Sequence, residues 1–252
     1  MFERIRKLFS GPPPDPAQHA DSQGPMSVSE SGYAPVSEWA ATQGFEFLAQ
    51  GLRQAFAVTG DVRGRPWRLE LGPPSRSYVV GEELRARADL GTPGEIAVVV
   101  MSRPLKALLQ AQADLRAAGQ ADAPMQTGPG EELDWLAQYP EVRWDGPPDP
   151  LWSSFAVLAQ RPQDAAAWLE PELVRQLLAW PLLGVKSEVP FLLLLLNGKL
   201  MLRMEYFPAD LATLQHAAGI FTNACESALA VFPAPDAARK ETPDRHRHRA
   251  IA

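Results

Sequence analysis

The segment 191–207 constrains the fold more than any other part of the chain. Five consecutive leucines run into Asn197-Gly198, and an alternating segment, 199–206, follows. Asn-Gly between two strand-like runs is the strongest short-range signal for a β-hairpin, because both central residues of a type I′ turn need positive φ. The first arm is apolar on both faces, which predicts an interior strand. The second arm alternates between apolar and polar residues, which predicts a position nearer the edge of the same sheet.

Other segments carry the patterns of strands and helices. Strands are predicted at 45–49, 55–59, 67–71, 83–90, 95–101 and 155–159, although 83–90 is also compatible with a helix because its apolar residues are small. Helices are predicted from Ser37 to Gly44 and at 104–118, 131–138, 163–179 and 209–232. The last of these has a continuous apolar seam, formed by Leu211, Leu214, Ala218, Phe221, Cys225, Ala228 and Phe232.

Together these patterns predict an α+β fold. A mainly antiparallel sheet is expected to be covered on one side by helices 104–118, 163–179 and 209–232, with the C-terminal β-hairpin leading into the long closing helix. With 252 residues the chain can form one globular domain, predicted at 35–232, and prolines near 145–150 mark the alternative of two smaller units. Residues 1–34 are predicted to be a basic amphipathic segment and a disordered linker, and residues 233–252 a disordered tail.

Residues able to carry chemistry are few. The single cysteine, Cys225, excludes an intrachain disulfide and a cysteine-based zinc site. His216 is the one histidine inside the predicted domain, and helical spacing puts it on a different face from Cys225. No nucleotide-binding glycine motif is present. We therefore predict no catalytic residue, no metal ligand and no cofactor, and the net charge of −6 argues against nucleic acid as a partner.

Carboxylates do gather at three places along the chain. These are Glu82-Glu83, Glu131-Glu132 with Asp134, and Asp145 with Asp149. Adjacent residues of a strand point to opposite faces, and glutamates suit the first turn of a helix, so solvation and capping explain them without an active site. A carboxylate-dependent hydrolase is the alternative.

The N-terminal segment 2–9 carries the best functional hint. Its residues are Phe2, Arg4, Ile5, Arg6, Lys7, Leu8 and Phe9, with the apolar side chains on one face of a short helix and the cations on the other. Such a segment suits an anionic membrane surface or the groove of a partner, and the alternative is an inert N-terminus. No secretory signal is recognised, and the longest apolar run, about eight residues, is far below the ~20 that span a bilayer. The expected location is the cytoplasm, with peripheral contact at the inner membrane.

A second hint is a cluster of cations around Trp67. Arg63, Arg65, Arg68 and Arg76 could form a cationic patch that holds an acidic partner or a phosphate. A solvated hairpin face is the plainer explanation of the same residues.

The region from about residue 151 to 232 resembles bacterial proteins of unknown function. The likeness rests on FAVLAQRPQDAAAWLEPELVRQLL and FLLLLLNGKLMLRMEYFPADLATL, a strand and a Leu-rich helix followed by a hairpin and a long helix. It involves packing positions and implies no activity and no site residues.

The leading functional hypothesis is a non-enzymatic intracellular protein that acts through contacts with an unidentified protein partner. The alternative is a module that binds an apolar or acidic small ligand in a pocket between sheet and helices. Tryptophans that could line such a pocket are Trp67, Trp152, Trp168 and Trp180.

Overall fold

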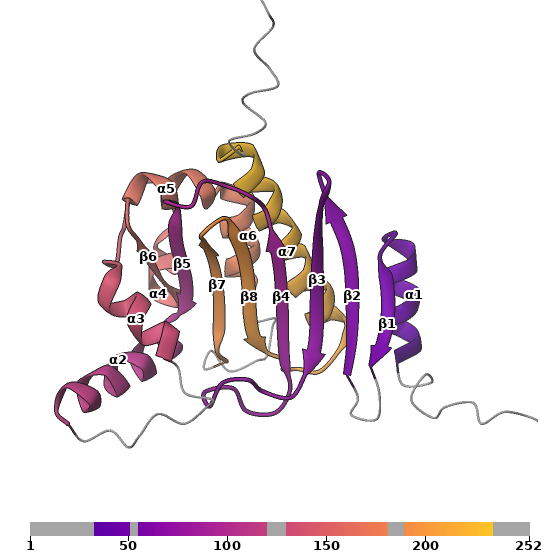
Figure 1. Ribbon diagram of the computed structural model, residues 1–252, viewed down its shortest axis with the longest axis horizontal. Coiled ribbons are helices and arrows are strands. Elements are labelled where there is room, and N and C mark those ends of the chain that lie inside the picture. The colour runs from indigo at the N-terminus through magenta and orange to yellow at the C-terminus, as the bar shows by residue number, and fades with distance from the viewer. Residues whose placement is uncertain (1–32, 51–54, 120–129, 181–188, 234–252) are drawn as a thin grey trace, which may run out of the picture.

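The fold is α+β, with one antiparallel sheet at its centre (Figure 1). The computed structural model describes residues 33–50, 55–119, 130–180 and 189–233, which form eight strands and seven helices. The strands are β1 (Glu46–Gln50), β2 (Ala55–Val62), β3 (Arg65–Gly72), β4 (Glu83–Asp89), β5 (Ala97–Ser102), β6 (Phe155–Ala159), β7 (Phe191–Leu196) and β8 (Lys199–Glu205). The helices are α1 (Ala34–Thr42), α2 (Arg103–Ala117), α3 (Gly130–Gln138), α4 (Asp149–Ser154), α5 (Pro162–Trp168), α6 (Pro171–Leu178) and α7 (Leu211–Val231).

The strands follow the order β1-β2-β3-β4-β8-β7-β5-β6, and every neighbouring pair is antiparallel. The predicted hairpin is present: β7 and β8 are joined by Asn197 and Gly198, both at positive φ. The prediction that the second arm lies nearer the edge is wrong. β8 lies in the interior, because β4 pairs with its other side over seven residues. Its alternating pattern reflects one polar face of the sheet and not the absence of a neighbour.

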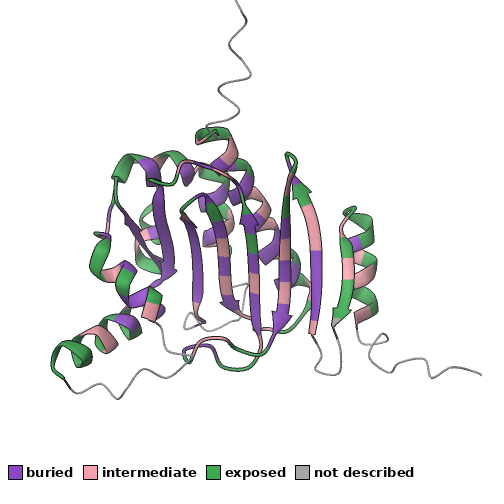
Figure 2. Cartoon of the chain, viewed as in Figure 1, coloured by how far each residue is buried: buried purple, intermediate pink, exposed green. Residues whose placement is uncertain are grey.

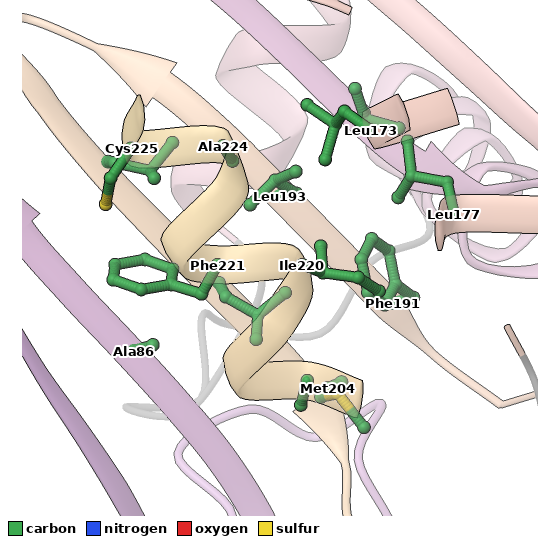
Figure 3. Close-up of a cluster of buried hydrophobic side chains, with 14 of the residues drawn as sticks. Ala86, Leu173, Leu177, Phe191, Leu193, Met204, Ile220, Phe221, Ala224 and Cys225 are labelled. Atoms are coloured by element: carbon green, nitrogen blue, oxygen red, sulfur yellow. The ribbon is translucent and has the colours of Figure 1, made fainter. Parts of the chain in front are cut away.

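The main core lies between one face of the sheet and helices α1, α4, α5, α6 and α7. In β7, Phe191, Leu193 and Leu195 point to this face. Figure 3 shows α7 crossing it, with Phe221 on the side of Ala86 in β4 and Ile220 on the side of α6. The apolar seam predicted for α7 packs as expected, with its middle five residues buried.

The first turn of α7 is fixed by a side-chain cap. The Asp210 carboxylate accepts a hydrogen bond of 2.7 Å from the backbone N–H of Thr213. An aspartate at this position satisfies a backbone donor that has no partner within the helix and complements the helix dipole. This cap sets where α7 turns back over the sheet after β8.

The opposite face of the sheet has a second, smaller core. Here Val99, Leu158 and Leu194 pack against α2 and α3. The prediction that α2 shares one face with α6 and α7 is therefore wrong. β5, β6 and β7 are apolar on both faces, so they require helices on both sides to remove them from water.

The β6 edge of the sheet is covered by the segment 140–142. The backbone N–H of Val142 donates a hydrogen bond to the Val157 carbonyl, and the backbone N–H of Ala159 donates one to the Pro140 carbonyl. The α4 helix directly precedes β6, in a region where the sequence predicted only a proline break.

Among the described residues, helices α2 and α3 cover only part of the second face. Along β3, β4 and β8 the burial alternates residue by residue, as Figure 2 shows in the centre of the sheet. The buried residues point to the main core, and the half-exposed ones are mostly charged. We call the uncovered part, formed by β1–β4 and β8, the open face.

Candidate functional site

The open face is built from two rows of side chains that run across the strands. The strand register places Thr59, Arg68, Arg87 and Met201 in the first row. The second row contains Ala57, Glu70, Arg85 and Arg203. In each row two arginines stand directly opposite one another on neighbouring strands. Such like-charged pairs are unfavourable unless acidic groups offset them.

In the second row, two buried glutamates provide that offset. Arg203 Nε lies 2.6 Å from Oε1 of Glu83 and forms an ion pair with it, but the angles do not allow a hydrogen bond. Arg203 Nη1 donates a hydrogen bond of 2.7 Å to Oε1 of Glu132. Arg76 Nε also donates to Glu132, at 2.8 Å. Both glutamates are completely buried. Since a buried carboxylate is stable only when it is paired, this cluster ties β4, β8, α3 and the segment before β4 together.

Tyr78 completes the environment of Glu132. Its hydroxyl donates a hydrogen bond of 2.9 Å to Oε1 of that carboxylate. Burial, and then the nearby Glu132 charge, raise the pKa of Tyr78 above its ordinary value, so the hydroxyl stays protonated and remains a donor.

The expectation that the carboxylate clusters are solvated is wrong for Glu83 and Glu132. The sequence places them 49 positions apart, and only the packing of α3 over the sheet brings both to Arg203. The proximity of Glu83 and Glu132 does not support the hydrolase alternative. Neither carboxylate is exposed, and each is held by arginine, so neither is placed to activate a water molecule for attack.

In the first row, the positive charges are less well matched by carboxylates than in the second row. Arg68 forms an ion pair with Glu70. Arg87, directly across from Arg68, is exposed, and no carboxylate among the described residues lies within ion-pairing distance of it. Its neighbour on β8 is the half-buried Met201. A cation without a partner therefore stands beside an apolar side chain in the middle of the open face.

Two hollows meet at this point. The larger, of about 850 Å³, lies over β1–β4 and β8 and includes Thr59, Arg68 and Lys199. The smaller, of about 320 Å³, lies toward α3 and includes Arg85, Arg203 and Trp135. Arg87 and Met201 line both hollows. The open face thus offers one continuous surface that changes from charged to apolar.

The arginines of the predicted cationic patch occupy different surroundings. Arg63 is exposed in the turn between β2 and β3, and Arg65 begins β3 with its guanidinium beside Gly91. Arg68 lies on the open face, whereas Arg76 is engaged by Glu132. The residues that sequence reasoning missed are Arg85, Arg87 and Arg203. Their alternation with apolar residues in β4 and β8 was a signal for one polar face, but the signal did not show that these strands are neighbours.

The predicted membrane or partner segment, 2–9, lies outside the described residues. Among those that are described, no helix is both long enough and apolar enough to cross a membrane.

The four tryptophans proposed as a ligand pocket do not line one common hollow. The indole N–H of Trp168 donates to the Ala224 carbonyl, and Trp180 stacks on His216. Trp152 packs edge-on against Trp144, and Trp67 contacts Phe221 in the main core. Trp135, which was not singled out, is the tryptophan that lines the smaller hollow of the open face.

Of the two residues able to take part in nucleophilic chemistry, Cys225 is buried and His216 is half-buried. His216 Nε2 lies 3.0 Å from the carbonyl oxygen of Gln176, and burial lowers the pKa of His216. Burial, and then Glu226, raise the pKa of the Cys225 thiol, which opposes formation of a reactive thiolate. Within the described ranges, no group of three histidine, cysteine or acidic side chains is placed to hold a metal ion.

Comparison with solved structures finds a neighbour of low similarity. No protein-family model matches the chain, and no curated protein matches it. The crystal structure of the mycobacterial trehalose monomycolate transport factor A, TtfA, is similar over 79% of this chain and 94% of that one, with a TM-score of 0.41 and 12% sequence identity.

Proposed function

We propose that this protein is a non-enzymatic binding protein that acts through contact with a partner protein, and that the open face of its sheet is the contact surface. The observation that carries the proposal is the position of Arg87. This cation is exposed, has no acidic partner among the described residues, and lines both hollows together with Met201.

The chemistry of the surface defines the partner. The half-buried Arg68 and the exposed Arg87 face each other, and Arg87 has no counter-charge within ion-pairing distance in the part of the chain that the structure describes. An acidic side chain of the partner would remove this imbalance, and charged hydrogen bonds to arginine are among the stronger polar contacts. An apolar residue next to that acid would cover Met201. We therefore expect a partner segment with an acidic residue beside an apolar one.

A cytoplasmic location and peripheral membrane contact through residues 2–9 belong to the same proposal. The support for the membrane contact is the basic amphipathic pattern of that segment. Co-sedimentation with anionic liposomes, comparing the full chain with a chain lacking residues 1–10, tests the membrane contact. Equal pelleting of the two chains would contradict it.

Site-specific photocrosslinking in cells tests the partner contact. A photoreactive amino acid at Met201 is expected to give a defined crosslinked species, and Arg87→Glu in the same chain is expected to abolish it by charge repulsion. Arg116→Glu is the matched control, since Arg116 is exposed on α2, away from the open face. A crosslink that survives Arg87→Glu, or that both variants reduce equally, would refute the proposal.

A further inference from the structure

The smaller hollow of the open face joins two chemical environments. One wall is apolar and comes from Trp135 on α3, Leu192 and Leu194 on β7, and Met201 on β8. The other wall is polar: it contains Ser75, the cations Arg85, Arg87 and Arg203, and the carboxylates of Glu70 and Glu131, which are paired with Arg68 and Arg76. A volume of about 320 Å³ lies at the lower end of the range for small-molecule sites. The walls suit a ligand with one polar end and one apolar end.

The polar wall contains two guanidinium groups that the described residues pair weakly or not at all. Arg85 makes only a distant ion pair, 3.9 Å, with Glu83, and its side chain is 34% exposed. Arg87 is exposed, and no described carboxylate lies within ion-pairing distance of it. An acceptor placed in the hollow would receive charged hydrogen bonds from these two side chains, both of which line it.

Charge balance sets the charge of that acceptor. The ion-paired groups balance among themselves: Arg76, Arg85 and Arg203 are paired with Glu83, Glu131 and Glu132. Arg68 is paired separately with Glu70. Arg87 has no ion pair among the described residues and lines the hollow. A single negative charge in the hollow neutralises Arg87, whereas a second would be unpaired.

We infer that this hollow binds a small monocarboxylate that carries an apolar chain. Arg85 and Arg87 hold the carboxylate, and Trp135, Leu194 and Met201 cover the apolar chain. Guanidinium donors match the acceptor oxygens of a carboxylate, and the apolar wall selects against acids without a hydrocarbon part. This inference goes beyond the proposed partner contact and does not rest on it, because a free acid would occupy the hollow without any partner present.

Titration of the full-length protein with octanoate, octan-1-ol and acetate tests the two halves of the site separately. Isothermal calorimetry is expected to show saturable binding of octanoate and at least about tenfold weaker binding of the other two, because each lacks one of the recognised groups. Two-dimensional NMR is expected to show shifts of the Trp135 indole N–H and the Met201 methyl group. Equal affinity for octanoate and octan-1-ol, or no saturable binding of octanoate, would overturn the inference.

Variants assign the binding to the named residues. Arg87→Gln and Arg85→Gln are each expected to weaken octanoate binding about tenfold, with Arg116→Gln as the surface control. Arg87 is exposed and forms no ion pair among the described residues, so Arg87→Gln keeps the test decisive if Arg85→Gln disturbs the fold. Unchanged octanoate affinity in Arg87→Gln would overturn the inference. These measurements use no partner protein, so their failure is distinct from failure of the crosslinking experiment.

Discussion

Replacement of Leu194 by aspartate is expected to prevent the protein from folding. Leu194 is 2% exposed and lies in β7 between Val99 of β5 and Met201 of β8. Its side chain packs in the second core beneath α2 and α3. The position is therefore enclosed by strands on both sides and by helices above.

Two costs add at this position. Truncating a buried leucine typically destabilises a protein by about 2–5 kcal/mol, through lost burial and the cavity that remains. A carboxyl group without a partner adds a desolvation cost of several kcal/mol, whether it stays ionised or takes up a proton. The sum, roughly 5 kcal/mol or more, is comparable to the total stability of about 5–15 kcal/mol of a typical domain. The Leu194→Asp chain is thus expected to lack a cooperative unfolding transition.

Urea denaturation followed by tryptophan fluorescence and circular dichroism measures the effect. Leu194→Ala is expected to keep the fold and to lower the free energy of unfolding by about 3 kcal/mol. Leu48→Asp is the matched control on the same sheet, because Leu48 is 56% exposed on β1, and its effect is expected to stay within about 0.5 kcal/mol. A Leu194→Asp protein with the wild-type urea midpoint would refute the placement of β7 in the interior.

Three further predictions test other parts of the fold. Arg203→Met leaves the two buried glutamates of the cluster short of a cation and is expected to cost about 3–5 kcal/mol in urea unfolding, more than Arg116→Met on the surface. Gly198→Ala is expected to destabilise the protein in thermal unfolding, because the new Cβ would lie 2.8 Å from a backbone carbonyl oxygen and φ is +75°. Gly219→Ala is expected to stabilise the protein by up to about 1 kcal/mol, because Gly219 lies in α7 with open space around it. Hydrogen bonds from Arg103, and then from Lys106, lower the pKa of Glu141 to about 2, although partial burial opposes this shift. The stability that the lowered pKa contributes is therefore present above about pH 4.5 and is lost as the pH falls toward 2. Glu141→Gln should flatten the pH dependence of unfolding in that window, and an unchanged acid profile would contradict the assignment.

The local elements of this fold could be predicted from the sequence because their signals are local. Asn197-Gly198 defines its own turn, and the seam of α7 is a property of one helix. The position of β8 was predicted wrongly because its second neighbour, β4, is more than a hundred residues away in the chain. An alternating pattern indicates that one face of the strand is polar. A strand at the edge and a strand in the middle of a half-covered sheet have the same pattern, so the pattern does not distinguish them.

The candidate site was harder to predict, because its residues also come together through contacts between segments that are distant in the sequence. Arg85, Arg87 and Arg203 each stand in an ordinary alternating pattern, and nothing in their local sequence distinguishes them from solvated surface residues. Glu83 and Glu132 look like first-turn or strand-end acids, yet they are buried because α3 carries one of them onto the sheet. The site is a property of strand order and helix placement, and both are set by contacts distant in sequence.

The charge pattern also explains why the second face is only half covered. A helix can cover β5, β6 and β7 because their side chains on that face are apolar, and α2 and α3 do so. The same helix over β3 and β4 would bury Arg87, and a buried cation without a counter-charge costs several kcal/mol. The described residues supply enough glutamates for the arginines around Arg203 but none within ion-pairing distance of Arg87. Anything that covers the open face must therefore bring its own negative charge, and this requirement follows from the sheet register whichever of the two proposed ligands meets it.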